Sequence, residues 1–138
     1  MKRIATFGVF DILHLGHVKF LEACRKIDKD SKLIVVISRD STVLKEKGKK
    51  PVIAEEERRQ IVESLKPVDE AILGHEGPNK LRIVEELKPD IIVLGYDQNW
   101  NEKKLKEKLE ERGLKTEVLR LKKYENVNST GIKNKLKI

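Results

Sequence analysis

The fold of this chain is decided by one stretch, Gly8-Val9-Phe10-Asp11-Ile12-Leu13-His14-Leu15-Gly16-His17, which directly follows an apolar run at residues 4–7. Parallel α/β proteins hold phosphates where a strand ends at a glycine and opens into a helix. The N–H groups of the first helical turn are unpaired there, and the helix dipole favours negative charge. His14 and His17 add imidazoles that donate hydrogen bonds or carry charge near neutral pH. Gly16 between them lets a ligand approach the backbone closely. The stretch therefore predicts a phosphate site at the mouth of the first helix.

Two histidines three residues apart are also compatible with a solvated helix start or with half of a metal site. A zinc site needs a cluster of ligands. The sequence contains only one further histidine, His75, and a single cysteine, Cys24. The same single cysteine excludes an internal disulfide. The phosphate-site interpretation is therefore preferred.

The composition fits a small enzyme that acts on anionic ligands. The chain has 138 residues and a net charge of +7, and one domain over residues 1–138 is expected. Aromatic residues make up only 4% of the sequence, and the lysines alternate with glutamates. This pattern is typical of solvated helix faces and makes nucleic acid an unlikely partner. No apolar run is long enough to cross a membrane, and the N-terminal residues are interpreted as a strand rather than a signal peptide.

Strand-like and helix-like segments alternate along the whole chain. Strands are predicted at 2–6, 32–38, 70–73, 90–95 and 116–121, and helices at 16–26, 54–65, 80–87, 101–112 and 129–136. Residues 39–53 are expected to form a polar, lysine-rich loop. Such alternation predicts an α/β fold, a doubly wound parallel five-stranded Rossmann-like sheet with helices on both faces and its site at the carboxyl ends of the strands.

The basic loop after the second predicted strand is the first test of that prediction, because it should lie at the same edge. It contains Lys45, Lys47, Lys49 and Lys50 around a glycine. A basic loop of this kind can fold over a triphosphate and stabilise the charge of a leaving pyrophosphate, or it can be an ordinary solvated loop.

Polar residues also follow the fourth and fifth predicted strands. Asp97 is a candidate to accept hydrogen bonds from a ribose or base, and Trp100 and Tyr96 either stack on a ring or pack against the protein. After the last strand, Ser129 and Thr130 begin a predicted helix. They either only cap that helix or form a second phosphate cradle.

These motifs resemble the nucleotidylyltransferase superfamily, whose signature is His-x-Gly-His after a Gly-x-Phe-Asp turn. The superfamily's C-terminal signature is matched by Val127-Asn128-Ser129-Thr130-Gly131-Ile132-Lys133. Residues 50–53, 57–65 and 68–71 resemble the glycerol-3-phosphate cytidylyltransferase branch, and residues 88–98 resemble archaeal FAD synthases.

The sequence departs from these families at three points. Val9 stands where many members have threonine, and Asn128 and Lys133 replace the usual serine and arginine. The cysteines that archaeal FAD synthases carry near the C-terminus are missing, which keeps the flavin assignment open.

The resemblance implies transfer of AMP from ATP to FMN, with Mg²⁺ entering with the triphosphate, in a cytoplasmic homodimer. A CTP-dependent enzyme acting on glycerol-3-phosphate or another small phosphate is the alternative, and an inactive nucleotide-binding regulatory module is the alternative from another class. No dedicated metal ligands are expected, although Asp11 either contacts the metal or only fixes the turn. The catalytic candidates are His14, His17 and Lys45, and the nucleotide-binding candidates are Val9, Phe10, His14, Leu15, Gly16, His17, Asp97, Tyr124, Ser129 and Thr130.

Overall fold

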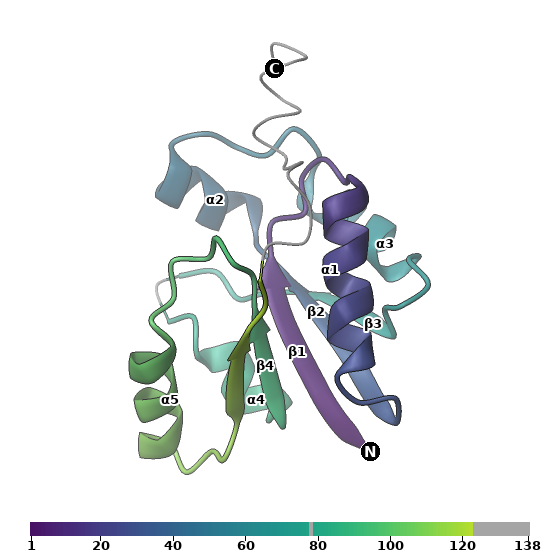
Figure 1. Cartoon of the computed structure of the whole chain (residues 1–138). Coiled ribbons are helices and arrows are strands. Elements are labelled where there is room, and N and C mark those ends of the chain that lie inside the picture. The colour runs from purple at the N-terminus through teal and green to yellow at the C-terminus, as the bar shows by residue number, and fades with distance from the viewer. Residues whose placement is uncertain (78, 123–138) are drawn as a thin grey trace.

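The computed structural model describes residues 1–77 and 79–122 (Figure 1). The helix expected at 129–136 and the site candidates Tyr124, Ser129, Thr130 and Lys133 lie outside these residues.

A five-stranded parallel sheet forms the centre of the molecule. Its strands are β1 Lys2–Gly8, β2 Ser31–Ile37, β3 Glu70–Leu73, β4 Ile91–Leu94 and β5 Glu117–Arg120, in the spatial order β3-β2-β1-β4-β5. The central strands are apolar because both faces of the sheet are covered, and all four residues of β4 are buried. The chain leaves β1 toward β2 on one side and returns to β4 on the other. In folds of this kind ligands bind at that reversal, outside the carboxyl ends of the strands.

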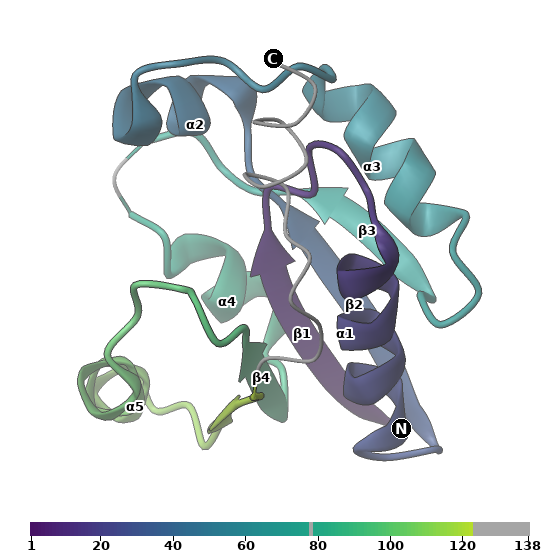
Figure 2. The same cartoon turned by 45° about the horizontal axis from the view of Figure 1, so that its top comes forward.

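Helices cover both faces of the sheet, as predicted (Figure 2). α1 Leu15–Lys26 and α3 Glu55–Glu63 pack on one face, where Leu21, Cys24 and Val62 join the buried cluster around β1 and β2. α4 Arg82–Leu87 and α5 Glu102–Glu111 pack on the other face through a second cluster that includes Leu105 and Leu109. The doubly wound α/β prediction is confirmed.

The expected loop at residues 39–53 is wrong in one respect, because it contains the helix α2 Asp40–Lys47. Three features end or anchor this short helix. Val43 is buried, Gly48 ends the helix with a left-handed φ of 75°, and the Asp40 and Glu55 carboxylates each accept a hydrogen bond from the other residue's backbone N–H. The pairing of Asp40 with Glu55 joins α2 to α3 through polar contacts. A helix anchored in this way needs no apolar periodicity, so the sequence pattern did not predict α2.

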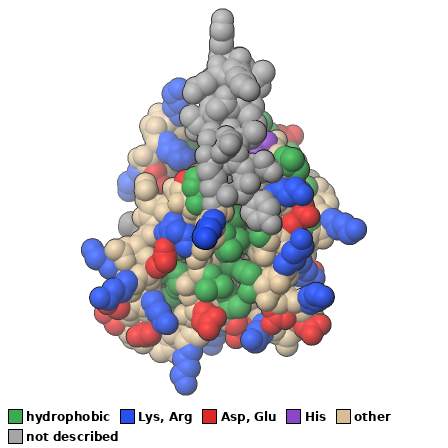
Figure 3. Space-filling view, viewed as in Figure 1, with side chains coloured by type: hydrophobic (Ala, Val, Ile, Leu, Met, Phe, Trp, Pro, Cys, Tyr) green, Lys and Arg blue, Asp and Glu red, His purple; other side chains and the backbone are tan. Residues whose placement is uncertain are grey.

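The surface matches the mixed charge of the sequence. Lys and Arg side chains are interspersed with Asp and Glu on the face shown in Figure 3, rather than gathered in one stripe. Within residues 1–77 and 79–122, no helix is long and apolar enough to span a membrane.

Candidate active site

The two histidines of the His-x-Gly-His stretch cap the first helix with their own rings. His14 is the N-cap of α1, and its Nδ1 accepts the backbone N–H of Gly16 at 3.0 Å. In return, Nδ1 of His17 accepts the backbone N–H of His14 at 3.2 Å. The amides of His17 and Val18 donate to the carbonyl of His14. The first turn of α1 therefore already uses several of the amides that the sequence interpretation assigned to phosphate.

These contacts determine which ring nitrogen carries the proton. An Nδ1 that accepts a backbone N–H is unprotonated, so a neutral imidazole must carry its proton on Nε2. The two rings lie 4.0 Å apart between centroids. Nε2 of His14 is buried and has no hydrogen-bond partner among the residues that the structure describes. Each neutral imidazole thus carries one N–H, on Nε2, and the Nε2–H of His14 donates to no acceptor among the described residues.

Burial keeps both imidazoles neutral. It lowers the pKa of His14 below its usual value of 6.5. It lowers the pKa of His17 to about 4, with a smaller contribution from the neighbouring His14 ring. Near neutral pH the ligand-free pair therefore consists of two uncharged donors, rather than the two imidazolium ions that phosphate binding could also use.

The turn before the histidines is tightly packed around Phe10. Phe10 has a left-handed φ of 51°, is only 6% exposed, and lies 5.4 Å from the His17 ring between centroids. A Cβ placed on Gly8 would come within 2.5 Å of the Phe10 ring, so any side chain at this position would displace that ring. The side chain of Phe10 is therefore a packing element beneath His17, and any contact that it makes to a nucleotide would be through its backbone.

Asp11 fixes the turn, one of the two roles that the sequence left open. It is buried, and its two carboxylate oxygens accept the backbone N–H groups of Val52 and Ile53 at 2.9 and 2.8 Å. This joins the histidine turn to the segment before α3. Within the described ranges, no group of three or more His, Cys, Asp or Glu side chains could hold a metal ion.

Arg58 is the residue that sequence reasoning missed in this part of the site. Its guanidinium is fully buried and donates to the carbonyls of Val9 at 2.7 Å and Ile53 at 2.8 Å and to the carboxylate of Asp40 at 2.6 Å. One side chain therefore ties the histidine turn, the start of α2 and the start of α3 together. A signal was available, because Arg58 lies on the same helical stripe as Val62 and Leu65, which face the core.

The lysine candidates lie on and after α2. Lys45 is exposed on the helix, and Lys47, Lys49 and Lys50 are exposed at its end and beyond it. The anchoring of α2 by Asp40 and Glu55 places this basic segment at the carboxyl end of β2, beside the histidine turn. Leu15, between the histidines, is likewise exposed.

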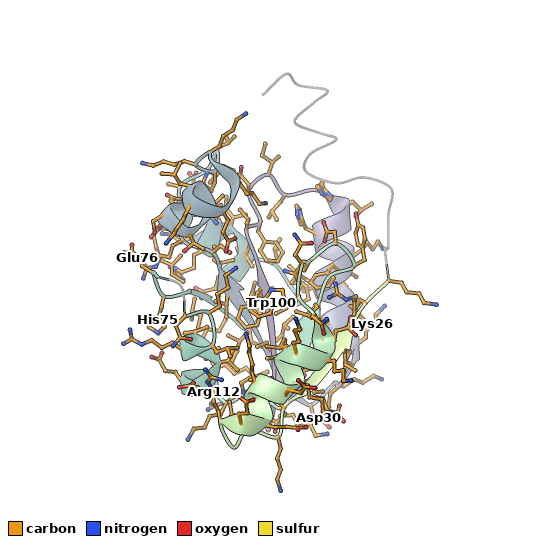
Figure 4. The ribbon with its side chains drawn as sticks, turned by 90° about the vertical axis from the view of Figure 1, so that its left-hand side faces the viewer. Lys26, Asp30, His75, Glu76, Trp100 and Arg112 are labelled. Atoms are coloured by element: carbon orange, nitrogen blue, oxygen red, sulfur yellow. The ribbon has the colours of Figure 1, made fainter. Side chains whose placement is uncertain are left out.

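The segment after β4 forms a second wall at the same edge. Asp97 and Tyr96 are exposed, whereas Trp100 packs against the buried cluster beneath α4 and α5, with Nζ of Lys80 5.7 Å from the centre of its ring (Figure 4). Gln98 and Arg120 hold this segment in place, and sequence reasoning missed both. The only feature of the sequence that could have indicated a role for Arg120 is its position as a charged residue at the end of a half-buried strand.

Cys24 takes no part in this chemistry. It lies in the core, and burial raises the pKa of its thiol to about 12. The thiol is therefore protonated and cannot act as a nucleophile near neutral pH.

Comparison of the chain with known proteins identifies its family. A family model described as cytidylyltransferase-like matches residues 5–135. The chain belongs to the cytidylyltransferase-like family. Among members of known name, it is 51% identical to the FAD synthase of Aciduliprofundum boonei over 131 residues, which cover 95% of this chain and 85% of the relative. It is 46% identical to the FAD synthase of Thermoplasma acidophilum over 136 residues, or 98% of this chain and 93% of the relative.

A solved member of similar sequence confirms the fold of this cytidylyltransferase-like chain. The structure from Thermoplasma volcanium has a TM-score of 0.84 at 45% identity and covers 91% of this chain and 99% of its own. It is described as a lipopolysaccharide core biosynthesis protein.

Proposed function

We propose that this protein is a nucleotidyltransferase that transfers AMP from ATP to FMN, giving FAD and pyrophosphate. The observation that carries the proposal is the pair of neutral imidazoles at the start of α1, in each of which Nδ1 accepts a backbone N–H and the proton is therefore on Nε2. The choice of FMN is supported by the FAD synthases that are 46–51% identical to this chain.

In the proposed reaction, a phosphate oxygen of FMN attacks the α-phosphorus of ATP in line. One O–P bond forms at the α-phosphorus, and the bond to the β-phosphate oxygen breaks, so pyrophosphate leaves with the electron pair. The acceptor phosphate is already an oxyanion, and no proton has to be removed from it. Catalysis therefore consists of positioning and of stabilising charge on the transferred group.

The chain's own residues perform both tasks. Nε2–H of His14 and of His17 would donate to the α-phosphate oxygens, on which negative charge develops. Lys45 and its neighbours on the β2 side of the histidines would hold the β- and γ-phosphates. The exposed Asp97, on the β4 side, would contact the ribose or base.

Mg²⁺ fits this site as an ion that enters with ATP. Asp11 is occupied by two backbone amides, and the described residues contain no carboxylate cluster, so most of the ion's ligands would be phosphate oxygens and water. Bound in this way, the ion would neutralise phosphate charge. We also propose that Ser129 and Thr130, which lie outside the described residues, complete the phosphate site.

We further propose that the enzyme is a homodimer and acts in the cytoplasm, where ATP and FMN are available. The apolar side chains of Val18 and Phe20 on α1, which are only half-buried, support the dimer. Sedimentation equilibrium should give twice the chain mass of 15.9 kDa. A mass of one chain at all concentrations would contradict the dimer.

The function is tested by following pyrophosphate release with Mg²⁺ in a two-by-two design. ATP and CTP are each combined with FMN and with glycerol-3-phosphate, and FAD is identified by chromatography. We expect turnover with ATP and FMN. Turnover only with CTP would overturn the proposal in favour of the cytidylyltransferase alternative. Nucleotide binding without turnover in any combination would favour an inactive regulatory module.

A further inference from the structure

We infer that Arg120 is a positioning residue for the nucleotide, because it holds the segment Gly95–Trp100 in the shape that receives the nucleoside. This inference rests on the proposed function and adds to it a residue on β5 that contacts no reacting atom. We refer to residues 95–100 as the β4–α5 loop.

One guanidinium group binds most of this loop. Nη1 of Arg120 donates to the carbonyls of Gly95 at 2.7 Å and Gln98 at 2.9 Å, and Nη2 donates to the carbonyl of Trp100. Nε contacts the carboxylate of Glu102 in the first turn of α5. Three loop carbonyls and the start of the next helix are therefore held from β5.

This set of contacts requires an arginine. The guanidinium has five N–H donors in a rigid planar fork, which can reach several carbonyls at once. A lysine ammonium has three donors at a single point on a flexible stem and cannot satisfy carbonyls at both ends of the loop. The Arg120 side chain is only 24% exposed, so most of it is shielded from solvent.

Gln98 holds the loop from the opposite side. Its Nε2 donates to the carbonyl of Phe7 on β1 at 2.7 Å, and its Oε1 accepts the backbone N–H of Gly95 at 2.8 Å. The loop is thus fixed between β1 and β5, across the carboxyl end of β4. The side chains of Tyr96 and Asp97, in the middle of the loop, are exposed.

The position of the loop indicates which part of the substrate it receives. If the α-phosphate lies over His14 and His17, the lysines near α2 draw the β- and γ-phosphates toward β2, since β2 and β4 flank β1 on opposite sides. The nucleoside must then extend toward β4. A loop held rigidly in advance binds its ligand more tightly, because no ordering cost is incurred on binding.

Direct binding of a non-hydrolysable ATP analogue, by calorimetry, tests the inference without any acceptor. We expect Arg120→Lys and Arg120→Ala to raise the Kd of the analogue roughly 10- to 100-fold, the range produced by losing a few hydrogen bonds and ordering a loop. In turnover with ATP and FMN, the KM for ATP should rise similarly, while the KM for FMN and kcat stay within about 3-fold.

Two control variants separate positioning from general stability. Arg112→Ala removes an arginine that also contacts a glutamate, Glu85, and one carbonyl, but at the far end of α5 (Figure 4). Glu102→Gln weakens the ion pair of Arg120 and leaves its three carbonyl contacts. Both should leave the Kd of the analogue within about 3-fold of the wild type, because neither loosens the loop.

An unchanged Kd in Arg120→Lys would overturn the inference, as would an equal rise in the KM for FMN. If Arg120→Ala fails to fold, Arg120→Lys alone decides, since it keeps the charge beside Glu102. The proposed function has a separate test. It fails if the wild-type protein binds the ATP analogue but makes no FAD, and in that case the binding comparison still tests Arg120.

Discussion

At the scale of single residues, the histidine pair shows how one side chain can serve both the fold and the chemistry. The same Nδ1 atoms that cap α1 determine that Nε2 carries the proton. Replacing histidine by asparagine can preserve the cap, because an amide oxygen is a good acceptor at an N-cap. It cannot place a donor where Nε2–H lies. Asparagine variants therefore separate catalysis from capping better than alanine variants do.

We expect His14→Asn and His17→Asn each to lower kcat roughly 10²- to 10⁴-fold, the range for removing one group that stabilises transition-state charge. His75→Asn is the matched control, because His75 contacts only Glu86 among the partners found on the described surface. It should retain full activity. Near-normal turnover in either site variant would contradict the proposed role of the pair.

The lowered pKa values of the pair predict the pH dependence of the reaction. A histidine whose pKa is lowered to about 4, as for His17, is already neutral throughout the range from pH 6 to 8.5. Rising pH therefore removes no proton from the donor at Nε2, and kcat/KM should not fall between pH 7 and 8.5. Below about pH 6 it should fall, because phosphate monoesters such as the acceptor gain a proton there. A steady loss of kcat/KM above pH 7 would instead indicate that an imidazolium is required.

At the scale of elements, the difference between what could and could not be predicted has a physical cause. Strand β4 is a continuous apolar run, and burial on both faces makes such a run easy to recognise. Helix α2 has no apolar stripe, and its anchor is the reciprocal pairing of Asp40 with Glu55 in another helix. Contacts of this kind depend on the folded arrangement, so a local pattern cannot show them.

The same reasoning applies to the candidate site. The His-x-Gly-His stretch could be predicted because all its parts are adjacent in sequence. Arg58, Gln98 and Arg120 were missed, because each donates to a carbonyl that is distant in the sequence, that of Val9, Phe7 and Gly95 respectively. Arg58 shows the limit well: it lies on a core-facing stripe, but its polar character directs attention to the surface.

Arg58 also gives the sharpest prediction about stability. Arg58→Ala should lower the free energy of unfolding by about 3–5 kcal/mol, because it leaves the Asp40 carboxylate and two carbonyls without their buried donor. The neighbouring Arg59 makes ion pairs at the surface with Glu56 and Glu63. Arg59→Ala should therefore cost only about 0–1 kcal/mol.

Urea unfolding of both variants beside the wild type measures this difference. Equal losses of unfolding free energy in the two variants would show that the Arg58 network does not hold the histidine turn to α2 and α3.

At the scale of the whole molecule, the substrate site crosses the middle of the sheet. The histidines follow β1, the lysines of α2 follow β2, and the β4–α5 loop follows β4, so the two halves of the fold each supply one wall. The two buried clusters join these halves, because each contains side chains of both β2 and β4: Val35 and Val93 lie in one, and Val36 and Ile92 lie in the other. A ligand that contacts both walls should therefore stabilise the domain as a unit, whereas a ligand that contacts one wall should do so less.

This arrangement predicts how ligands shift thermal unfolding. At 100 times its Kd, a ligand adds about 2.7 kcal/mol to the free energy of unfolding. For a domain of this size, that raises the midpoint by roughly 8–15 °C.

At equal concentration, ATP with Mg²⁺ should raise the midpoint more than pyrophosphate or adenosine alone, because only ATP reaches from the α2 lysines to the β4–α5 loop. In Arg120→Lys, the rise of the midpoint with ATP should shrink toward the rise with pyrophosphate. The β4–α5 loop is loosened in this variant, whereas the α2 lysines are unchanged. Equal shifts for ATP and pyrophosphate in the wild type would mean that the nucleoside makes no contact with the β4 side of the sheet.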